Sequence, residues 1–303
     1  MSISLRKTVI IIAGPTAVGK TTAAITLAKH FHTEIISADS RQCFKELKTG
    51  VARPSESELK EVKHHFLASH SIKDEMTAAG FEQFALQKAA LLFKSHNKVI
   101  MVGGTGLYIK AFCEGLDEIP PTGTGIREKI LKNYQENGMK WLLEEIKKKD
   151  AAFFEVGEIK NPQRIIRALE VMESTGISIL KFRKGKKAER DFRIIKIGLE
   201  LPREELNTRI NERVNKMMES GLTDEVKGLQ EFKQLSALQT VGYKEIFEYL
   251  HGNITLSQTI EKIKKNTRNY AKRQITWFKK DKEFAWFHPG EIENMIRFIN
   301  LKG

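Results

Sequence analysis

The chain has 303 residues, of which 41% are hydrophobic and 29% are charged, a balance that excludes a disordered chain and is ordinary for a protein with one large core or two modest ones. Its formal net charge of +13 at pH 7 favours a polyanionic partner such as nucleic acid. No apolar run approaches the ~20 residues of a membrane span, and the N-terminus lacks a signal-peptide pattern, so we expect a cytoplasmic protein with no membrane partner.

Strand-like and helical patterns alternate along the first third of the chain. Apolar runs at 9–13, 35–38 and 99–102 predict buried strands. Apolar residues at helical spacing predict helices at 21–31 and 81–96. This alternating order favours an α/β fold with a parallel sheet flanked by helices.

The character of the chain changes after two prolines at 120 and 121. Residues 122–190 are helical in pattern, rich in Lys, Arg and Glu, and predict an inserted all-helical subdomain. Residues 192–201 alternate as a strand that returns the chain to the sheet, and helical patterns follow to about residue 279. We therefore expect a discontinuous core of residues 1–121 and 191–303.

The most specific local motif is GPTAVGKT, which fits the phosphate-binding loop pattern G-x-x-x-x-G-K-[ST] between a strand and a helix. In such a loop the backbone amides and the helix N-terminus face one pocket, Lys20 adds a positive charge, and the Thr21 hydroxyl can hold Mg²⁺. A nucleotide and an isoprenoid diphosphate present similar oxygens, so the loop does not distinguish them. The predicted polyphosphate site consists of Gly14, Pro15, Thr16, Ala17, Val18, Gly19, Lys20 and Thr21.

Two further stretches lie where predicted strands end. Asp39 follows the strand at 35–38 within the sequence ADSRQ. Ligands of parallel sheets bind outside the carboxyl ends of the strands, so Asp39 should face the same crevice as the phosphate loop, as a base or a metal ligand. Alternatively, Asp39 only caps the following turn. The glycines of VGGTGLYI, at 102–109, allow close approach of backbone or ligand at a third strand end.

These three stretches, in this order and spacing, resemble the tRNA dimethylallyltransferase (isopentenyltransferase) family. The similarity continues through NPQRIIRALE at 161–170, VGYKE at 241–245 and TRNYAKRQITW at 267–277, and spans nearly the whole chain. It implies a P-loop NTPase-like sheet, a bacterial-type monomer without a zinc finger, and Mg²⁺ as cofactor. Phe44 departs from the tyrosine more usual in the family, which concerns packing or a peripheral RNA contact more than chemistry.

The resemblance implies transfer of a dimethylallyl group from dimethylallyl diphosphate to the exocyclic N6 amine of the adenosine just 3′ of the tRNA anticodon. This amine is a weak nucleophile, so we expect Asp39 to be its general base. The loop donors, with Lys20 and a Mg²⁺ at Thr21, are expected to stabilise charge on the leaving diphosphate. Arg213 is a further candidate clamp on the diphosphate, although Arg209 lies one turn away on the same helical face.

The adenine must leave the stacked anticodon loop to reach the cleft. By resemblance, Asp39 and its neighbours Ser40, Arg41 and Gln42, with Thr105, line the RNA side of the channel. Asn161 followed by Pro162 predicts the start of a helix. The resemblance assigns contacts with the anticodon stem-loop to five residues of that helix, Gln163, Arg164, Ile165, Ile166 and Arg167.

The last helical block has a basic face and an apolar one. Lys265, Arg268 and Lys272 share the basic face, which is either an RNA contact or a solvated surface. Tyr270 and Trp277 are expected in the core.

Two other functions stay open. A kinase of the nucleoside or shikimate type would bind ATP with the same loop and use Asp39 to position an acceptor hydroxyl, but would not explain a basic helical insertion. A non-catalytic RNA-binding module would keep the nucleotide site as a switch. His64 and His65 lack a third ligand at recognisable spacing, and Cys43 and Cys113 are far apart, so we expect neither pair to bind a metal.

Overall fold

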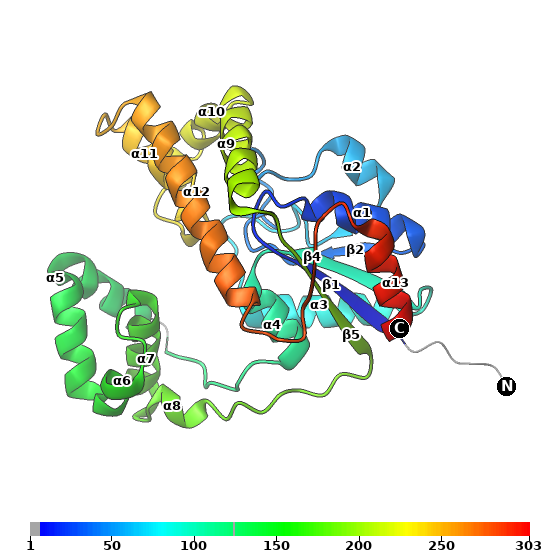
Figure 1. The fold of residues 1–303 in the computed structure, drawn as a ribbon. Coiled ribbons are helices and arrows are strands. Elements are labelled where there is room, and N and C mark those ends of the chain that lie inside the picture. The colour runs from blue at the N-terminus through cyan, green and yellow to red at the C-terminus, as the bar shows by residue number, and fades with distance from the viewer. Residues whose placement is uncertain (1–6, 124) are drawn as a thin grey trace. The chain divides into compact units, whose positions relative to one another are not determined.

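The computed structural model describes residues 7–123 and 125–303. The chain divides into two compact units (Figure 1). The sheet unit combines the described residues of Met1–Glu114 with Glu189–Gly303, and the helical unit is Gly115–Ala188. The chain therefore forms a discontinuous core that is interrupted by a helical insertion.

In the described residues of the sheet unit, six parallel strands form one sheet in the order β3-β2-β4-β1-β5-β6. The predicted α/β fold with a parallel sheet is confirmed. The edge strands β3 and β6 were not predicted, because two or three residues show no alternating pattern. The strands are β1 (Thr8–Ala13), β2 (Ile35–Ser37), β3 (His64–His65), β4 (Lys98–Gly103), β5 (Arg193–Leu199) and β6 (Ala285–Phe287).

Alternate residues of the central strand β1 point to opposite faces of the sheet. Val9 and Ile11 pack in the cluster that contains α3 (Ala78–Leu92) and α4 (Gly106–Glu114). The intervening isoleucines pack with α1 (Lys20–His30) and α13 (Ile292–Lys302). Because helices cover both faces, the strands read as continuous apolar runs (Figure 1).

The remaining helices of the sheet unit include α9 and α12, which pack against each other; Arg268 of α12 donates to Asn211 Oδ1 of α9 at 2.6 Å. Two short 3-10 turns, Gln230–Phe232 and Ser236–Leu238, connect α10 to α11. These helices are α2 (Glu56–Glu61), α9 (Arg203–Glu219), α10 (Leu222–Lys227), α11 (Tyr243–Leu250) and α12 (Leu256–Phe278).

The helical unit has its own apolar core, formed by α5 (Ile126–Lys149), α6 (Ala151–Val156), α7 (Pro162–Thr175) and α8 (Ile179–Phe182). The predicted start of α7 is confirmed, because the Asn161 side chain accepts from the backbone of Gln163 at 3.1 Å.

The helical unit begins at Gly115 rather than at the expected residue 122. The carboxylate of Asp117 accepts from the backbone N–H groups of Lys184 and Gly185, both at 3.0 Å. These bonds join the segment that enters the unit to the segment that leaves it, so both segments belong to the helical unit.

Candidate active site

The phosphate loop links β1 to α1, as predicted. Gly14 has φ 153°, and a Cβ there would lie 2.7 Å from the carbonyl oxygen of Leu199, so this position requires glycine. Gly19, with φ 101°, precedes α1 and provides no side-chain cap. The first backbone N–H groups of α1 are therefore available to an anion.

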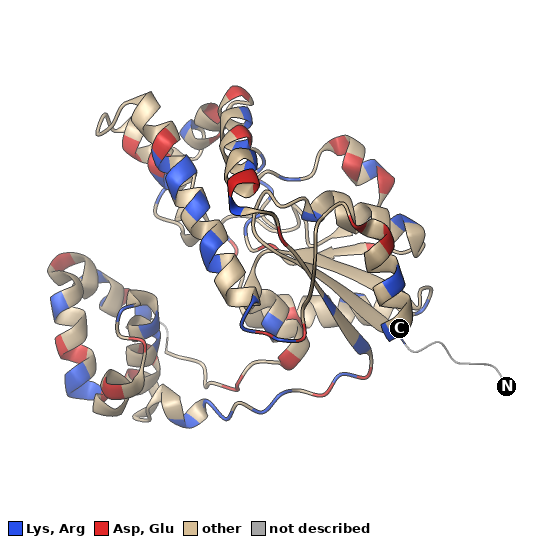
Figure 2. Cartoon of the chain, in the orientation of Figure 1, with Lys and Arg blue, Asp and Glu red and all other residues tan. Residues whose placement is uncertain are grey.

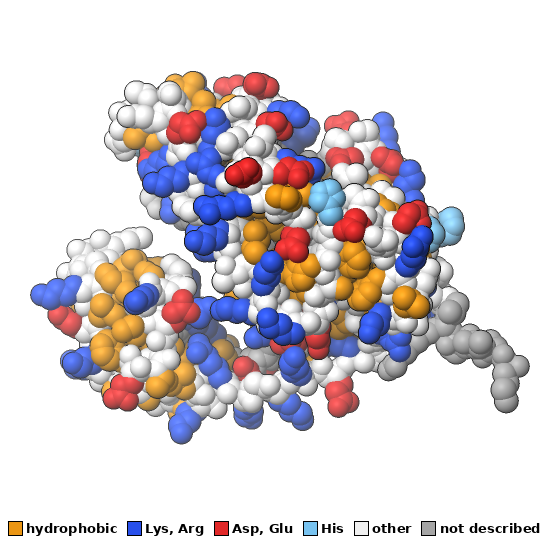
Figure 3. Space-filling view, viewed as in Figure 1, with side chains coloured by type: hydrophobic (Ala, Val, Ile, Leu, Met, Phe, Trp, Pro, Cys, Tyr) orange, Lys and Arg blue, Asp and Glu red, His pale blue; other side chains and the backbone are white. Residues whose placement is uncertain are grey.

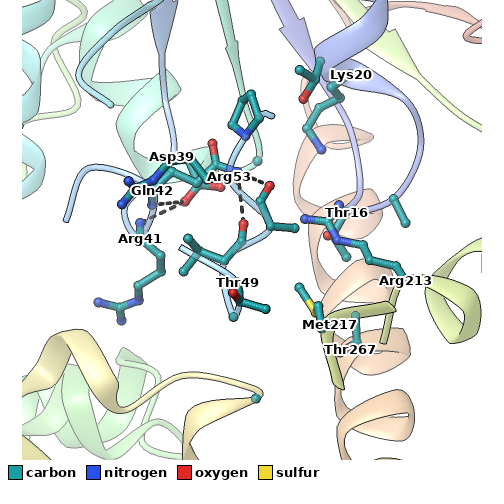
Figure 4. Close-up of a pocket in the computed structure, with 18 of the residues that line it drawn as sticks. Thr16, Lys20, Asp39, Arg41, Gln42, Thr49, Arg53, Arg213, Met217 and Thr267 are labelled. Atoms are coloured by element: carbon teal, nitrogen blue, oxygen red, sulfur yellow. Dashed lines mark hydrogen bonds between the residues drawn. The ribbon is translucent and has the colours of Figure 1, made fainter. Parts of the chain in front are cut away.

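An open cavity of about 760 Å³ lies at the carboxyl ends of the strands and is lined by all three predicted stretches. Thr16, Lys20 and Thr21 come from the phosphate loop, Asp39 from the end of β2, and Gly103 and its neighbour from the end of β4. Figure 4 shows Asp39 across the cavity from Lys20. The structure therefore brings the predicted diphosphate residues and the predicted base to one site.

Asp39 both caps its turn and lines the cavity. Its Oδ1 accepts from the backbone N–H groups of Arg41 at 2.8 Å and Gln42 at 3.1 Å. Among the described residues, none donates a hydrogen bond to Oδ2. The turn thus fixes the orientation of the carboxylate while one oxygen is left for a ligand. The two interpretations of Asp39 drawn from the sequence are not exclusive.

Two cations face this carboxylate. Burial and, to a smaller extent, the nearby Arg213 lower the pKa of Lys20 to about 7, although the negative charge of Asp39 partly opposes the shift. Burial also lowers the pKa of Arg213, again against the attraction of Asp39. Arg209 lines the same cavity but pairs with Glu205 at 2.8 Å. Positive charge held at a buried position is suited to an anionic ligand, and Arg213 is better placed than Arg209 to supply it.

Gln274 of α12 joins the phosphate loop to the end of β4. Its Oε1 accepts from the backbone N–H of Thr16 at 2.9 Å, and its Nε2 donates to the carbonyl oxygen of Gly104 at 2.9 Å. A Cβ at Gly104 would lie 2.2 Å from that Nε2, so the close approach requires glycine. We did not predict a site role for Gln274; its place in the sixth motif, TRNYAKRQITW, was the available signal.

The residues expected on the RNA side lie beside the cavity. The backbone N–H of Ser40 donates to Thr105 Oγ1 at 3.0 Å, and the Thr105 hydroxyl lies 3.3 Å from that of Ser40. Ser40 and Arg41 also line a second, adjoining cavity of about 450 Å³. Gln42 instead directs its amide into the protein, where Nε2 donates to two carbonyl oxygens, those of Val51 and Ala52.

Two aromatic residues of α12 are exposed, and their prediction as core residues is wrong. Tyr270 and Trp277 are each 38% exposed. Tyr270 lines both cavities, and the guanidinium of Arg273 lies 5.8 Å from its ring centroid. An open aromatic ring beside a basic group is suited to stacking with a nucleobase.

Basic side chains run along α12. Lys265 and Lys272 are exposed, whereas Arg268 is half-buried and bonded to Asn211. Figure 2 shows Lys and Arg repeated along this helix, and Figure 3 shows basic side chains gathered over it. This surface is suited to a nucleic-acid backbone.

In the helical unit, the five residues assigned to tRNA by resemblance fall into two groups. Gln163 and Arg164 are exposed and Arg167 is half-buried. Ile165 and Ile166 are fully buried in the core of the unit, so the assignment of their side chains to tRNA is corrected to a packing role.

Arg167 shares a buried carboxylate with a second arginine. Glu170, whose side chain is 2% exposed, accepts from Arg167 at 3.0 Å and from Arg127 at 2.5 Å. The carboxylate holds the two guanidinium groups near each other beside the middle of α7. Arg127 had no role in the prediction, because it lies in another helix.

No group of three or more His, Cys, Asp or Glu side chains that could hold a metal occurs in the described residues. His64 Nδ1 lies 2.9 Å from the Val62 carbonyl oxygen and His65 Nε2 lies 2.5 Å from Glu34. Thr21 lines the larger cavity. Its hydroxyl oxygen, together with ligand phosphates and water, suits Mg²⁺, which keeps several waters, so this residue fits that ion.

The fold and the cavity define a P-loop α/β protein in which the phosphate loop and a carboxylate line one cavity. None of the helices in residues 7–123 and 125–303 has the length and apolar character needed to cross a membrane.

Comparison with known proteins gives the family. The model of the IPP transferase family matches residues 42–281, and the chain belongs to this family. It is 45% identical over 298 residues to the tRNA dimethylallyltransferase of Cytophaga hutchinsonii, covering 98% of both chains. It is 44% identical over 295 residues to tRNA dimethylallyltransferase 1 of Bacteroides thetaiotaomicron, covering 97% of this chain and 96% of the relative.

A solved structure agrees with this assignment. The full-length tRNA isopentenylpyrophosphate transferase of Bacillus halodurans superposes with a TM-score of 0.72 at 32% identity, covering 98% of this chain and 97% of that chain. The resemblance found in the sequence is confirmed, and the kinase alternative is not favoured.

Proposed function

We propose that the protein transfers a dimethylallyl group from dimethylallyl diphosphate to the N6 amine of the adenosine just 3′ of the tRNA anticodon. The products are N6-isopentenyladenosine and diphosphate. The observation that carries the proposal is one cavity lined by the phosphate loop, two cations and a fixed carboxylate, in a chain whose relatives are named tRNA dimethylallyltransferases (Figure 4).

The diphosphate end of the donor binds at the phosphate loop. Backbone N–H groups of the loop and the start of α1, with Lys20 and Arg213, neutralise the charge that develops as the C–O bond breaks. A bound diphosphate also returns Lys20 to its charged form. The prenyl chain lies against the apolar lining of the cavity, which includes Val51, Met217 and Ile263.

The acceptor amine attacks the first carbon of the prenyl group and loses a proton. Asp39 takes this proton, because its carboxylate lines the cavity and its turn fixes its orientation. The new C–N bond replaces the C–O bond of the donor, and diphosphate leaves with its electron pair.

Mg²⁺ would be held by Thr21 with diphosphate oxygens, and when bound it would supply further positive charge to the leaving group.

The RNA enters from the side of the second cavity. Base flipping brings the adenine to Asp39, and Tyr270 with Arg273 stacks against a neighbouring base. Lys265 and Lys272 of α12 contact the backbone, as do Arg164 and Arg167 of the helical unit. The proposal includes a cytosolic location, as the sequence pattern suggests, and a monomer, as the family resemblance implies.

The test is prenyl transfer to RNA. Purified protein, Mg²⁺ and dimethylallyl diphosphate are incubated with an anticodon stem-loop RNA, and RNA mass is measured beside a reaction that contains only ATP. Prenylated RNA without ATP supports the proposal. Unchanged RNA with ATP consumed would point to a kinase.

A further inference from the structure

One wall of the larger cavity has no regular secondary structure. Residues 48–54, here called the wall segment, connect the turn after Asp39 to α2, and all of them line the cavity. Thr49 and Arg53 lie on one side of the cavity and Met217 of α9 on the other (Figure 4). The segment also contains Ala52, whose φ is 43°, an unusual conformation for a residue with a side chain. Such a wall keeps its position only if other parts of the protein hold it.

Glu225 of α10 holds the start of the wall segment. Its Oε2 accepts from the backbone N–H groups of Lys48 at 3.2 Å and Thr49 at 2.7 Å, and its Oε1 accepts from that of Gly50 at 3.1 Å. Three consecutive backbone donors therefore converge on one carboxylate. Charged acceptors make stronger hydrogen bonds than neutral ones, so this contact fixes the turn firmly.

Tyr243 orients this carboxylate. Its hydroxyl donates to Glu225 Oε1 at 2.5 Å, and its ring is fully buried. The ring also packs closely against the segment, since a Cβ at Gly50 would lie 2.5 Å from it. Glycine is thus required at position 50 by the close approach of the ring rather than by backbone conformation.

The middle of the wall segment is bonded to Gln42, whose backbone in turn bonds to the predicted base. The amide of Gln42 donates to the carbonyl oxygens of Val51 and Ala52, both at 3.1 Å, and the backbone N–H of Gln42 donates to Asp39. The wall segment therefore lies between two anchors, Asp39 with Gln42 on one side and Glu225 on the other.

We infer that Glu225 and Tyr243 are positioning residues for the prenyl chain of the donor, an inference that rests on the proposed function. They act through the wall segment, which places Val51 and Ala52 against the organic part of the ligand. Neither residue belongs to the phosphate loop, so their influence falls on the prenyl group and spares the diphosphate.

Glu225→Gln tests this inference. A carboxamide offers one acceptor oxygen where the carboxylate offers two, so at least one backbone N–H of the turn loses its partner. Tyr243→Phe removes only the hydroxyl and leaves the backbone bonds of Glu225 in place. Asp224→Asn, at the exposed neighbouring position of α10, makes the same charge change away from the wall and is the matched control.

Binding of dimethylallyl diphosphate and of inorganic diphosphate is measured by calorimetry on protein saturated with a stem-loop RNA that carries inosine at the target position. Inosine has no exocyclic amine, so no transfer occurs. Loss of a partly buried hydrogen-bond partner predicts about tenfold weaker binding of dimethylallyl diphosphate to Glu225→Gln, with inorganic diphosphate changed by less than about twofold. Tyr243→Phe should weaken the binding of dimethylallyl diphosphate by about threefold.

Two results would overturn the inference: an equal loss of affinity for both ligands, or an unchanged affinity for dimethylallyl diphosphate in both variants. Glu225 and Tyr243 would then have a purely structural role. The proposed function is tested by a separate experiment. It is decided by prenyl transfer to adenosine-containing RNA with the wild-type protein, whereas the calorimetric comparison needs no turnover.

Discussion

Gln274 accepts a hydrogen bond of 2.9 Å from the backbone N–H of Thr16, a residue 258 positions away in the chain. The same amide donates to Gly104, so a single side chain of α12 sets the distance between the phosphate loop and the end of β4. Gln274 is 6% exposed, and its two contacts account for both ends of its amide. The shape of the cavity at the phosphate loop therefore depends on a residue of the last long helix, α12.

Gln274→Ala should weaken both stability and diphosphate binding. It leaves a partly buried backbone N–H and a buried carbonyl without partners, which lowers the free energy of unfolding by about 2 kcal/mol. Thermal unfolding and the KM for dimethylallyl diphosphate measure the two effects. Asn269→Ala, at an exposed position of the same helix, is the control and should change neither. A normal KM in Gln274→Ala would show that the phosphate loop keeps its shape without this bridge.

Asp39→Asn should lower turnover by ~10²-fold or more while RNA binding stays near normal. Asparagine retains an oxygen that accepts from the turn, so this substitution removes the base and preserves the local backbone. Glu212→Gln removes another carboxylate that lines the cavity and should retain activity. Single-turnover rates compare the two variants. If Glu212→Gln lost more activity than Asp39→Asn, the role of general base would move to Glu212.

Diphosphate affinity should depend on pH through Lys20. The pKa of this side chain is lowered from 10.5 to about 7 in the folded protein, so the charged form is increasingly lost above pH 7. Binding requires that form, and affinity should fall by up to about tenfold per pH unit above 7. In Lys20→Arg the guanidinium stays charged, which isolates the titration of Lys20 from that of the ligand. Parallel pH profiles for the two proteins would contradict this account.

The lowered pKa of Lys20 has the opposite effect on the pH dependence of folding stability. Between pH 7 and 10.5 the unfolded chain binds more protons at Lys20 than the folded protein does, so this group makes the ligand-free protein more stable as pH rises through that range.

Arg167→Ala should weaken tRNA binding and reduce the slope of log affinity against log salt concentration by about one, as expected for one lost phosphate contact. Donor affinity should stay unchanged. Lys160→Ala, an exposed cation of the same unit, provides the comparison. An unaltered salt slope in Arg167→Ala would mean that this arginine serves only to neutralise Glu170.

The parts of the site that depend on local sequence were predictable. The phosphate loop needs only a strand, a glycine-rich turn and a helix in succession, and the position of Asp39 follows from the rule that ligands bind at the carboxyl ends of parallel strands. Gln274 and Glu225 were missed because their partners are distant in sequence and are mostly backbone atoms, which leave no pattern in the side chains.

The wrong assignments have physical reasons as well. Helical periodicity placed Tyr270 opposite the basic face of α12, but that part of the helix borders open cavities instead of packed side chains. Family resemblance assigned a continuous block to tRNA, whereas a helix directs adjacent residues to different faces. Ile165 and Ile166 consequently pack inward while Arg164 is exposed.

The most direct test of the central claim is mass spectrometry of nuclease-digested stem-loop RNA after incubation with the protein, Mg²⁺ and dimethylallyl diphosphate. RNA with adenosine at the position 3′ of the anticodon should gain one five-carbon prenyl unit at that nucleoside, and RNA with inosine there should gain none. A prenyl unit on both RNAs, or on neither, would contradict transfer to the N6 amine.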